Sequence, residues 1–275
     1  MEVFRKVFVV TGGGNGMGRQ IVLNLLSKGA SVVAADMDPK GLQATSILAE
    51  DAGYNSFLPV ETNITDMKSV ENLLQKSVEK FGHVDGVINN AGIIQPFLKF
   101  NDTDYKIIER IFNVNLFGTI NMIKTFLPQL LAQEVGSLVN VSSMGGFLPI
   151  GGQAVYGASK AAVKSLSESL AEELKDTGVN VTTIIPGGLD TKIGAHSGIQ
   201  NKNAEAAEQA EPAPQAAKKT KALSPVAAAD MIVNAIIEDK KMVFVGIDSV
   251  QMNRLYRISP EKAAEVIHNK IKHHM

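Results

Sequence analysis

Tyr156 and Lys160 are the two residues of this chain whose types and spacing most directly suggest chemistry. A separation of four residues is just over one helical turn, so a phenol and an ammonium would stand on one face of a helix. A phenol has a pKa of about 10, and a cation held close to it favours the phenolate and lowers that pKa toward neutrality. The pair is therefore a candidate for proton transfer, although the same spacing also occurs on solvated helix faces.

A glycine-rich segment close to the N-terminus has the pattern of a phosphate-binding turn. Gly12, Gly16 and Gly18 follow an apolar run and open a segment of helical periodicity. Glycine allows the close backbone approach that a pyrophosphate requires, and the start of a helix supplies free N–H groups. Asp36 follows eighteen residues after Gly18, where a carboxylate can bind both hydroxyls of an adenosine ribose and repel a 2′-phosphate. The pattern favours NAD over NADP; the alternative is an ordinary Asp that caps the turn at Pro39.

The composition excludes several classes of function. The 275 residues are 45% hydrophobic and 20% charged, and a net charge of −1 gives no general attraction to nucleic acid or anionic membranes. There are no cysteines, which excludes disulfides, thiol nucleophiles and thiolate metal sites. The five histidines lack partners at metal-ligand spacing, so we expect no metal site. No apolar run is long enough to span a membrane and the first residues do not resemble a signal peptide, so we expect a cytoplasmic protein.

Short β-branched runs alternate with longer segments of helical periodicity through most of the sequence. The runs predict strands at 6–11, 31–36, 56–60, 84–89, 136–142, 179–185 and 242–246. The segments between them predict helices near 16–29, 39–52, 66–81, 103–132, 155–176 and 225–239. The strands are apolar without strict alternation, as expected for strands that are covered on both faces. We therefore predict an α/β fold, a doubly wound parallel sheet of about seven strands with helices on both faces.

Residues 198–222 break this rhythm, because they are rich in Ala, Glu, Lys, Gln and Pro and contain almost no large apolar side chains. Two interpretations stay open: a mobile surface insertion and a lid over the site. We expect one domain over residues 1–250, with the insertion inside 190–224 and a C-terminal helical extension over 251–275. We favour contact between this extension and a neighbouring subunit; the alternatives are a cover for the pocket and contact with a membrane surface.

Further motifs give the chain a resemblance to a known family. These motifs are the Thr11-Gly12 to Gly18 turn, Asn89-Asn90-Ala91-Gly92, Asn115, Ser143 thirteen residues before Tyr156, and Pro186-Gly187. Together they resemble the simple branch of the short-chain dehydrogenase/reductase family, over residues 1–190 and 224–247. The resemblance implies a Rossmann-type fold and an oxidoreductase that transfers hydride with a nicotinamide cofactor.

The resemblance also implies a catalytic set, composed of Asn115, Ser143, Tyr156 and Lys160. Ser143 would polarise the substrate oxygen, with Ser142 at the strand end as the alternative. Tyr156, with a lowered pKa, would take the alcohol proton in oxidation or give a proton in reduction. Lys160 would lower that pKa and hold the nicotinamide ribose, while Asn115 would support a water-mediated proton path from Lys160.

The cofactor contacts implied by the resemblance lie in the glycine-rich turn, at strand ends and on the catalytic helix. They are Gly12, Asn15, Gly16, Met17, Gly18, Asp36, Met37, Asn63, Ile64, Asn90, Gly92, Tyr156, Lys160, Pro186, Gly187, Leu189 and Thr191. Asn63 stands where the family usually has an Asp, so its carbonyl oxygen would bind the adenine amino group without a charge. For Asn89 and Ala91 we favour structural roles, which are strand-end hydrogen bonding and close packing.

The predicted activity is hydride transfer between NAD(H) and a secondary alcohol or ketone, and the alternative is a non-catalytic dinucleotide sensor on the same fold. Apolar residues that would form a wall for a hydrophobic substrate are Phe97, Phe147, Leu148, Pro149, Ile150, Val155 and Leu189. The same side chains would pack as core equally well. We expect no nucleic acid partner, and the resemblance implies a homodimer or homotetramer formed through the helices near 103–132 and 155–176.

Overall fold

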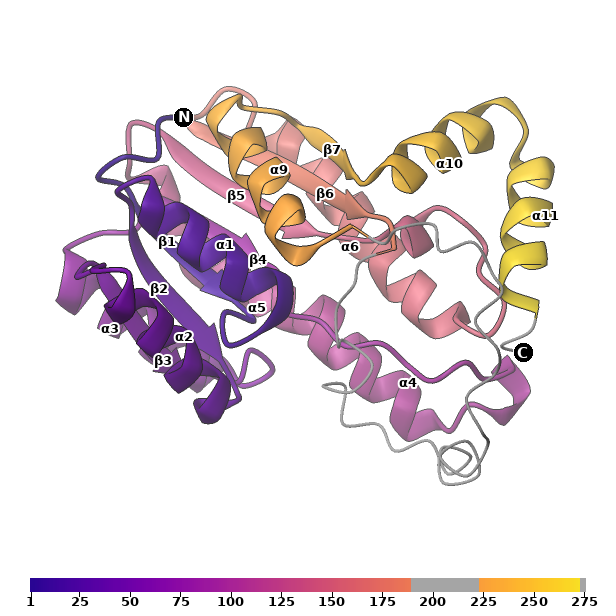
Figure 1. Cartoon of the computed structure of the whole chain (residues 1–275), viewed down its shortest axis with the longest axis horizontal. Coiled ribbons are helices and arrows are strands. Elements are labelled where there is room, and N and C mark those ends of the chain that lie inside the picture. The colour runs from indigo at the N-terminus through magenta and orange to yellow at the C-terminus, as the bar shows by residue number, and fades with distance from the viewer. Residues whose placement is uncertain (189–222, 273–275) are drawn as a thin grey trace.

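Seven parallel strands form one sheet at the centre of the protein (Figure 1). The structure is a computed structural model that describes residues 1–188 and 223–272. Across the sheet the strands are β3 (Phe57–Glu61), β2 (Ser31–Asp36), β1 (Val7–Thr11), β4 (Gly86–Asn89), β5 (Gly136–Val141), β6 (Val179–Pro186) and β7 (Met242–Val245). The strand order reverses between β1 and β4, and doubly wound sheets bind ligands outside the carboxyl ends of their strands at such a point. The predicted fold class is confirmed, and each strand lies within two residues of its predicted bounds.

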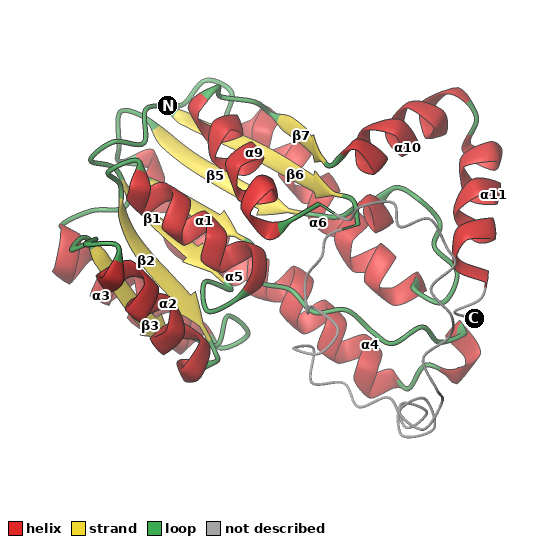
Figure 2. Ribbon diagram, viewed as in Figure 1, coloured by secondary structure: helices red, strands yellow, loops and turns green. Residues whose placement is uncertain are grey.

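Helices cover both faces of the sheet (Figure 2). One face is covered by α1 (Gly16–Ser27), α2 (Pro39–Asp51) and α9 (Pro225–Ile237). The other face is covered by α3 (Met67–Phe81), α5 (Thr119–Leu131) and α6 (Ala154–Glu173). Ile21 and Ile232 are fully buried on the first face, as are Leu73 and Phe126 on the second. Each such side chain stabilises the fold by about 1.5–3 kcal/mol, so the two layers hold the strand ends in fixed positions.

The segment predicted as one helix over 103–132 is interrupted in the structure. Its first part is α4 (Tyr105–Phe112), its middle is a π-helical turn over Asn113–Gly118, and its last part is α5. A π-helical turn contains an extra residue relative to an α-helix, and such turns are frequent at functional sites. Asn115 lies within this turn.

The C-terminal extension begins at Ile247 rather than at 251, and it consists of two helices. They are α10 (Ile247–Ile258) and α11 (Pro260–Ile271), which lie beyond the end of β7 in Figure 1. Ser259 separates them because the residue before a proline avoids the helical conformation, and its φ of −150° and ψ of 95° are extended. Met252, Ala263 and Ile267 of this pair are buried together with Leu148.

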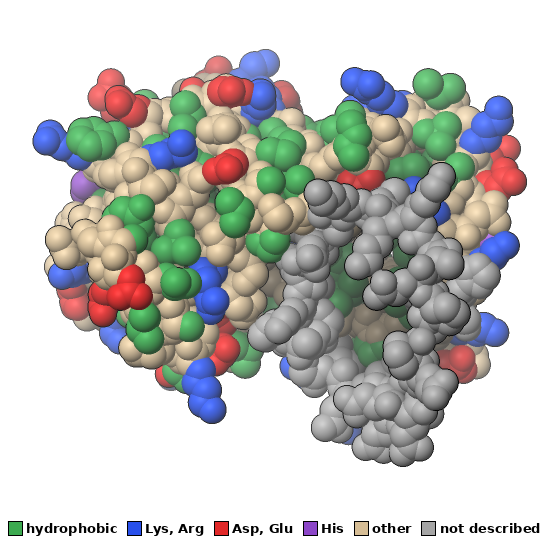
Figure 3. All heavy atoms as spheres, viewed as in Figure 1, with side chains coloured by type: hydrophobic (Ala, Val, Ile, Leu, Met, Phe, Trp, Pro, Cys, Tyr) green, Lys and Arg blue, Asp and Glu red, His purple; other side chains and the backbone are tan. Residues whose placement is uncertain are grey.

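The surface and the long insertion complete the description. On the face shown in Figure 3, acidic and basic side chains are interspersed, in keeping with the net charge of −1. Within residues 1–188 and 223–272, no helix has the length and apolar character needed to cross a bilayer. The predicted insertion at 198–222 lies outside the described residues.

Candidate active site

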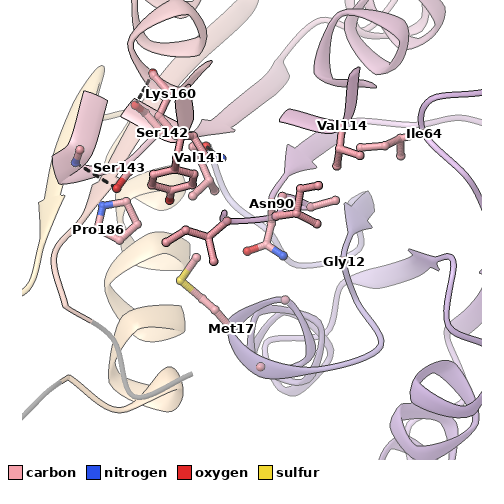
Figure 4. A pocket seen from close by; sticks show the side chains of 18 of the residues that line it. Gly12, Met17, Ile64, Asn90, Val114, Val141, Ser142, Ser143, Lys160 and Pro186 are labelled. Carbon is pink, nitrogen blue, oxygen red and sulfur yellow. Dashed lines mark hydrogen bonds between the residues drawn. The ribbon is translucent and has the colours of Figure 1, made fainter. Parts of the chain in front are cut away.

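A cavity of about 440 Å³ opens at the carboxyl ends of the strands, where the strand order reverses. Its lining includes the glycine-rich turn after β1, the ends of β2, β4, β5 and β6, and one face of α6. In Figure 4, Ser143, Lys160 and Pro186 lie at one end of the cavity, whereas Ile64 and Val114 lie at the other. All described residues that the sequence predicted as cofactor contacts line this one cavity.

The glycine-rich turn is built for close backbone approach. Gly12 has a φ of +70°, which L side chains rarely adopt. A Cβ on Gly18 would overlap the carbonyl oxygen of Gly12, so α1 can begin against the turn only with glycine at this position. Asn15 precedes α1 without a side-chain cap, so the first N–H groups of the helix are not taken up by a capping side chain. The turn therefore has the backbone geometry and the helix dipole that favour a phosphate group.

Asp36 lines the cavity at the end of β2, and its carboxylate is held by two backbone groups. Its Oδ2 accepts from Gly14 N at 2.9 Å, and its Oδ1 accepts from Asp38 N at 3.0 Å. The cap of α2 is Asp38, whose side chain accepts from Lys40 N. The bond from Asp38 N fits the alternative of an Asp that caps the turn at Pro39, while the bond from Gly14 N ties the same carboxylate to the glycine-rich turn.

Asn63 and Ile64 line the same part of the cavity, together with the exposed side chain of Met37. Asn63 Oδ1 accepts from Thr65 N at 3.1 Å and from Thr65 Oγ1 at 2.8 Å. A carbonyl oxygen has two acceptor positions, so this oxygen, predicted to contact the adenine amino group, is already fully used in this conformation.

The segment after β4 is bonded to the glycine-rich turn. Asn90 Nδ2 donates to Thr11 O at 2.9 Å, and the N–H groups of Asn90 and Ala91 both donate to Thr11 Oγ1 at 3.0 Å. Asn89 instead donates across the sheet to Asn140 Oδ1 at 2.8 Å. Asn90 therefore holds the floor of the cavity, and the contact of Asn89 is structural.

Tyr156 and Lys160 stand on the first two turns of α6, and Ser143 follows the end of β5. All three line the cavity, although Lys160 is only 4% exposed. Lys160 Nζ donates to Val141 O at 2.9 Å. Ser143 Oγ accepts from Gly145 N at 3.1 Å, whereas the alternative, Ser142, is buried and donates to Lys160 O at 2.7 Å. Ser143 is thus the serine hydroxyl that lies beside the phenol.

Burial is the main cause of the pKa shifts of Tyr156 and Lys160. Burial raises the pKa of Tyr156 above its ordinary value of 10.0, and a hydrogen bond with Ser143 offsets part of that rise. Burial also lowers the pKa of Lys160 from 10.5 to about 8. The prediction of a lowered pKa for Tyr156 is therefore wrong when only the groups of the protein act on the phenol. The loss of water around a phenolate outweighs the stabilisation that the neighbouring groups provide.

Asn115 lies behind the wall of the cavity rather than in it. Its Oδ1 accepts from Ile93 N at 2.8 Å, and its Nδ2 donates to Ile93 O and to Ser159 Oγ, both at 3.0 Å. A Cβ on Gly92 would lie 3.1 Å from Lys160 Nζ and 3.2 Å from Asn115 Oδ1. Asn115 and Lys160 therefore approach the same glycine, and the π-helical turn is what directs Asn115 toward it.

Comparison with known proteins agrees with this arrangement. A family described as short chain dehydrogenase matches residues 6–202. The chain belongs to this family. It is 34% identical over 258 residues to an oxidoreductase named SadH of Mycobacterium tuberculosis, covering 92% of this chain and 90% of that protein.

Solved structures of other proteins share this fold. A short-chain dehydrogenase/reductase from Burkholderia phymatum, in complex with NAD, has a TM-score of 0.83 at 26% identity over 95% of this chain and 96% of that chain. Levodione reductase has a TM-score of 0.68 at 30% identity, over 70% of this chain and 76% of that chain. This short-chain dehydrogenase is therefore an oxidoreductase with a Rossmann-like fold.

Gln95 is a residue of the dehydrogenase that the sequence analysis missed. Its Oε1 accepts from Tyr156 N at 2.9 Å, and its backbone oxygen accepts from Gln153 Nε2 at 2.9 Å. Gln95 is buried and therefore fixes the first turn of the helix that carries Tyr156. The available signal was a single amide residue between Ile94 and Pro96, in an otherwise apolar stretch.

The predicted substrate wall is only partly correct. Phe97 and Ile150 line the cavity of the dehydrogenase, together with Met144. Leu148 and Phe147 do not line the cavity but pack against the C-terminal helices. Pro149 is exposed and Val155 is buried, and neither lines the cavity. The remaining predicted site residues, Leu189 and Thr191, lie outside the described residues, and no cluster of metal-binding side chains occurs in the described part of the chain.

Proposed function

We propose that this protein is an NAD-dependent dehydrogenase that interconverts a secondary alcohol and a ketone. The observation that carries the proposal is a single cavity with a phosphate-binding turn and Asp36 among its lining, together with Tyr156, Lys160 and Ser143. A proton-transfer group and a dinucleotide-binding turn in one cavity match the two requirements of this reaction.

The lining of the cavity fits a dinucleotide. The turn at Gly12 and the start of α1 would hold the pyrophosphate, and the carboxylate of Asp36 would accept from the adenosine ribose hydroxyls. The negative charge of Asp36 would repel a 2′-phosphate, so we propose NAD rather than NADP. When bound, the nicotinamide supplies the carbon that accepts or donates hydride.

The protein groups perform the proton transfer. In reduction, the Tyr156 phenol donates its proton to the carbonyl oxygen while Ser143 Oγ donates a hydrogen bond to the same oxygen. In oxidation, the Tyr156 phenolate takes the alcohol proton. Lys160 holds the ribose beside the nicotinamide and carries positive charge below its pKa of about 8. Asn115 supports Lys160 indirectly, because its side chain donates to Ser159, the residue before Lys160.

The substrate that this end of the cavity favours is apolar. Phe97, Met144 and Ile150 line the cavity, whose lining also includes the polar side chains of Ser143, Gln153 and Tyr156. Apolar walls with a few convergent polar groups are typical of pockets for hydrophobic small molecules. We therefore propose a hydrophobic carbonyl compound and its alcohol.

We further propose a homodimer or homotetramer formed through α4, α5 and α6. Tyr105 and Phe117 lie in this region and are 79% and 52% exposed, which is unusual for large aromatic side chains. An interface through these helices would bury both aromatic side chains. Sedimentation equilibrium of the wild type and of Phe117→Asp would test the interface.

The test of the activity is Tyr156→Phe, assayed with a panel of hydrophobic alcohols and ketones by NADH absorbance. We expect turnover to fall by at least about 100-fold while NAD still binds in calorimetry, because only the ionisable oxygen is removed. Tyr105→Phe is the matched control, since it removes the same atom from an exposed tyrosine. Near-normal turnover in Tyr156→Phe would refute the assignment. Tight NAD binding by the wild type without turnover of any compound would favour the dinucleotide sensor instead.

A further inference from the structure

The turn after β6 forms part of the cavity through Pro186, Gly187 and Gly188. Gly187 N donates to Val245 O at 2.9 Å, which continues the pairing of β6 with β7. Gly188 is the first residue beyond that pairing, and its N–H donates to Asp248 Oδ2 at 2.7 Å. The turn at Gly188 is therefore held by a side chain that follows it by 60 positions, together with a bond from Leu223 N to Gly188 O at 3.3 Å.

Asp248 lies in the first turn of α10, where a carboxylate ordinarily binds N–H groups of its own helix. Here the helix has no side-chain cap, and the carboxylate instead accepts from Gly188 N. Among the described residues, no ion pair involves Asp248. Its charge is thus available to strengthen the hydrogen bond to the turn.

The backbone around Asp248 leaves room for this contact only because two positions are glycine. A Cβ on Gly187 would overlap both carboxylate oxygens, and a Cβ on Gly246 would lie 2.7 Å from Oδ1. The absence of side chains at both positions lets the carboxylate lie directly against the turn.

The start of α10 is itself fixed to the sheet. Ser249 is fully buried, and its Oγ donates to Ile185 O at 2.8 Å. Met252, one turn later, is buried against Leu148. Because Ser249 and Met252 fix the first two turns of α10 to the core, the backbone position of Asp248 is set by the core.

We propose that Asp248 is a positioning residue, which holds the Gly187–Gly188 turn in the conformation that receives the nicotinamide half of the dinucleotide. Asp248 acts through the turn and touches neither substrate nor proton-transfer groups. The inference rests on the proposed function, since it needs NAD as the ligand. It assigns to the C-terminal extension a role in cofactor binding within the same subunit.

The experiment is calorimetric titration of the full-length protein with NAD and, separately, with AMP, which occupies the adenine half alone. In Asp248→Ala we expect NAD affinity to fall about tenfold, the size expected for one hydrogen bond to a charged acceptor, with AMP affinity unchanged. Asp248→Asn keeps an acceptor oxygen and should restore most of the NAD affinity. Arg257→Ala removes an exposed bond to Asn253 near the far end of the same helix and should leave both affinities unchanged.

A second variant tests the contact without depending on cofactor. Gly187→Ala should lower the thermal stability of the wild type more than that of Asp248→Ala, because the added methyl overlaps the carboxylate only when it is present. Equal loss of NAD and AMP affinity in Asp248→Ala, or unchanged NAD affinity, would overturn the inference. A wild type that binds AMP but no NAD would overturn the proposed function as well, which separates the two failures.

Discussion

Replacement of Lys160 by methionine should change how the stability of the protein depends on pH. Lys160 is 4% exposed, and burial lowers its pKa from 10.5 to about 8. In the unfolded chain the pKa returns to its ordinary value, so between these two values the unfolded state binds more protons than the folded state. The stability of the wild type therefore rises with pH through this window, and the cost of burying the charge is fully present below it.

The magnitude follows from the difference between the two pKa values. A change from 10.5 to about 8 corresponds to about 3 kcal/mol of unfolding free energy. Between about pH 7 and about pH 9.5, the linkage gives a change of about 2 kcal/mol that Lys160→Met should lack. The variant also loses the hydrogen bond to Val141 O, which costs about 1–3 kcal/mol at every pH in this range. The slope with pH, rather than the difference at one pH, is therefore the diagnostic quantity.

The assay is urea unfolding of wild type and Lys160→Met at one fixed protein concentration across this pH range. Groups common to both proteins contribute equally, so they cancel in the difference between the two curves. Lys164→Met is the matched control, because Lys164 lies one turn along the same helix but pairs with Glu168 at the surface. It should not reproduce the slope. A constant difference between wild type and Lys160→Met over the whole range would refute the reasoning.

Three further outcomes test separate parts of the site. Asp36→Ala should weaken NAD binding by about 10- to 100-fold and reduce the preference over NADP, measured by titration with both nucleotides, because the bonds to the ribose hydroxyls are lost. Gln95→Ala should lower kcat about tenfold with little change in the KM for NAD, because the first turn of α6, which carries Tyr156, loses a hydrogen bond. Steady-state kinetics measures both constants. Without cofactor, Tyr156 should ionise above pH 10.0, which the ultraviolet tyrosinate signal of wild type would show and that of Tyr156→Phe would lack. Ionisation near neutral pH in that titration would contradict the dominance of burial.

The strands and most helices were predictable because their signals are local. The run at 31–36, for example, is β-branched and apolar, and it forms β2 with the same bounds. The π-helical turn was not predictable, because the helical periodicity over 103–132 is continuous. What changes the helix is a contact from outside it, between the Asn115 side chain and the backbone at Ile93.

The motifs predicted which described residues share one cavity, with the exception of Asn115, but they did not predict the energetics. Sequence spacing places Tyr156 and Lys160 on one helix face, yet it says nothing of how deeply that face is buried. Nor does it show that Lys160 Nζ donates to Val141 O. The roles of Phe147 and Leu148 depend in the same way on α10 and α11, which are distant in sequence and pack against these side chains. Contacts of this kind arise only when the chain is folded.

Burial shifts the pKa values of Tyr156 and Lys160 in opposite directions, because tyrosine is charged when it has lost its proton and lysine is charged when it carries one. In ordinary solution the pKa of a tyrosine, about 10, lies below that of a lysine, so phenolate and ammonium coexist over a narrow range. In the site, the pKa of Tyr156 lies above 10.0 and that of Lys160 at about 8, which reverses the order. The state between the two titrations is then a phenol beside a neutral amine. Proton donation to a ketone needs only the phenol, whereas proton removal from an alcohol needs an additional positive charge near Tyr156. Burial thus favours the phenol form of Tyr156, which is the form that the proposed reduction uses.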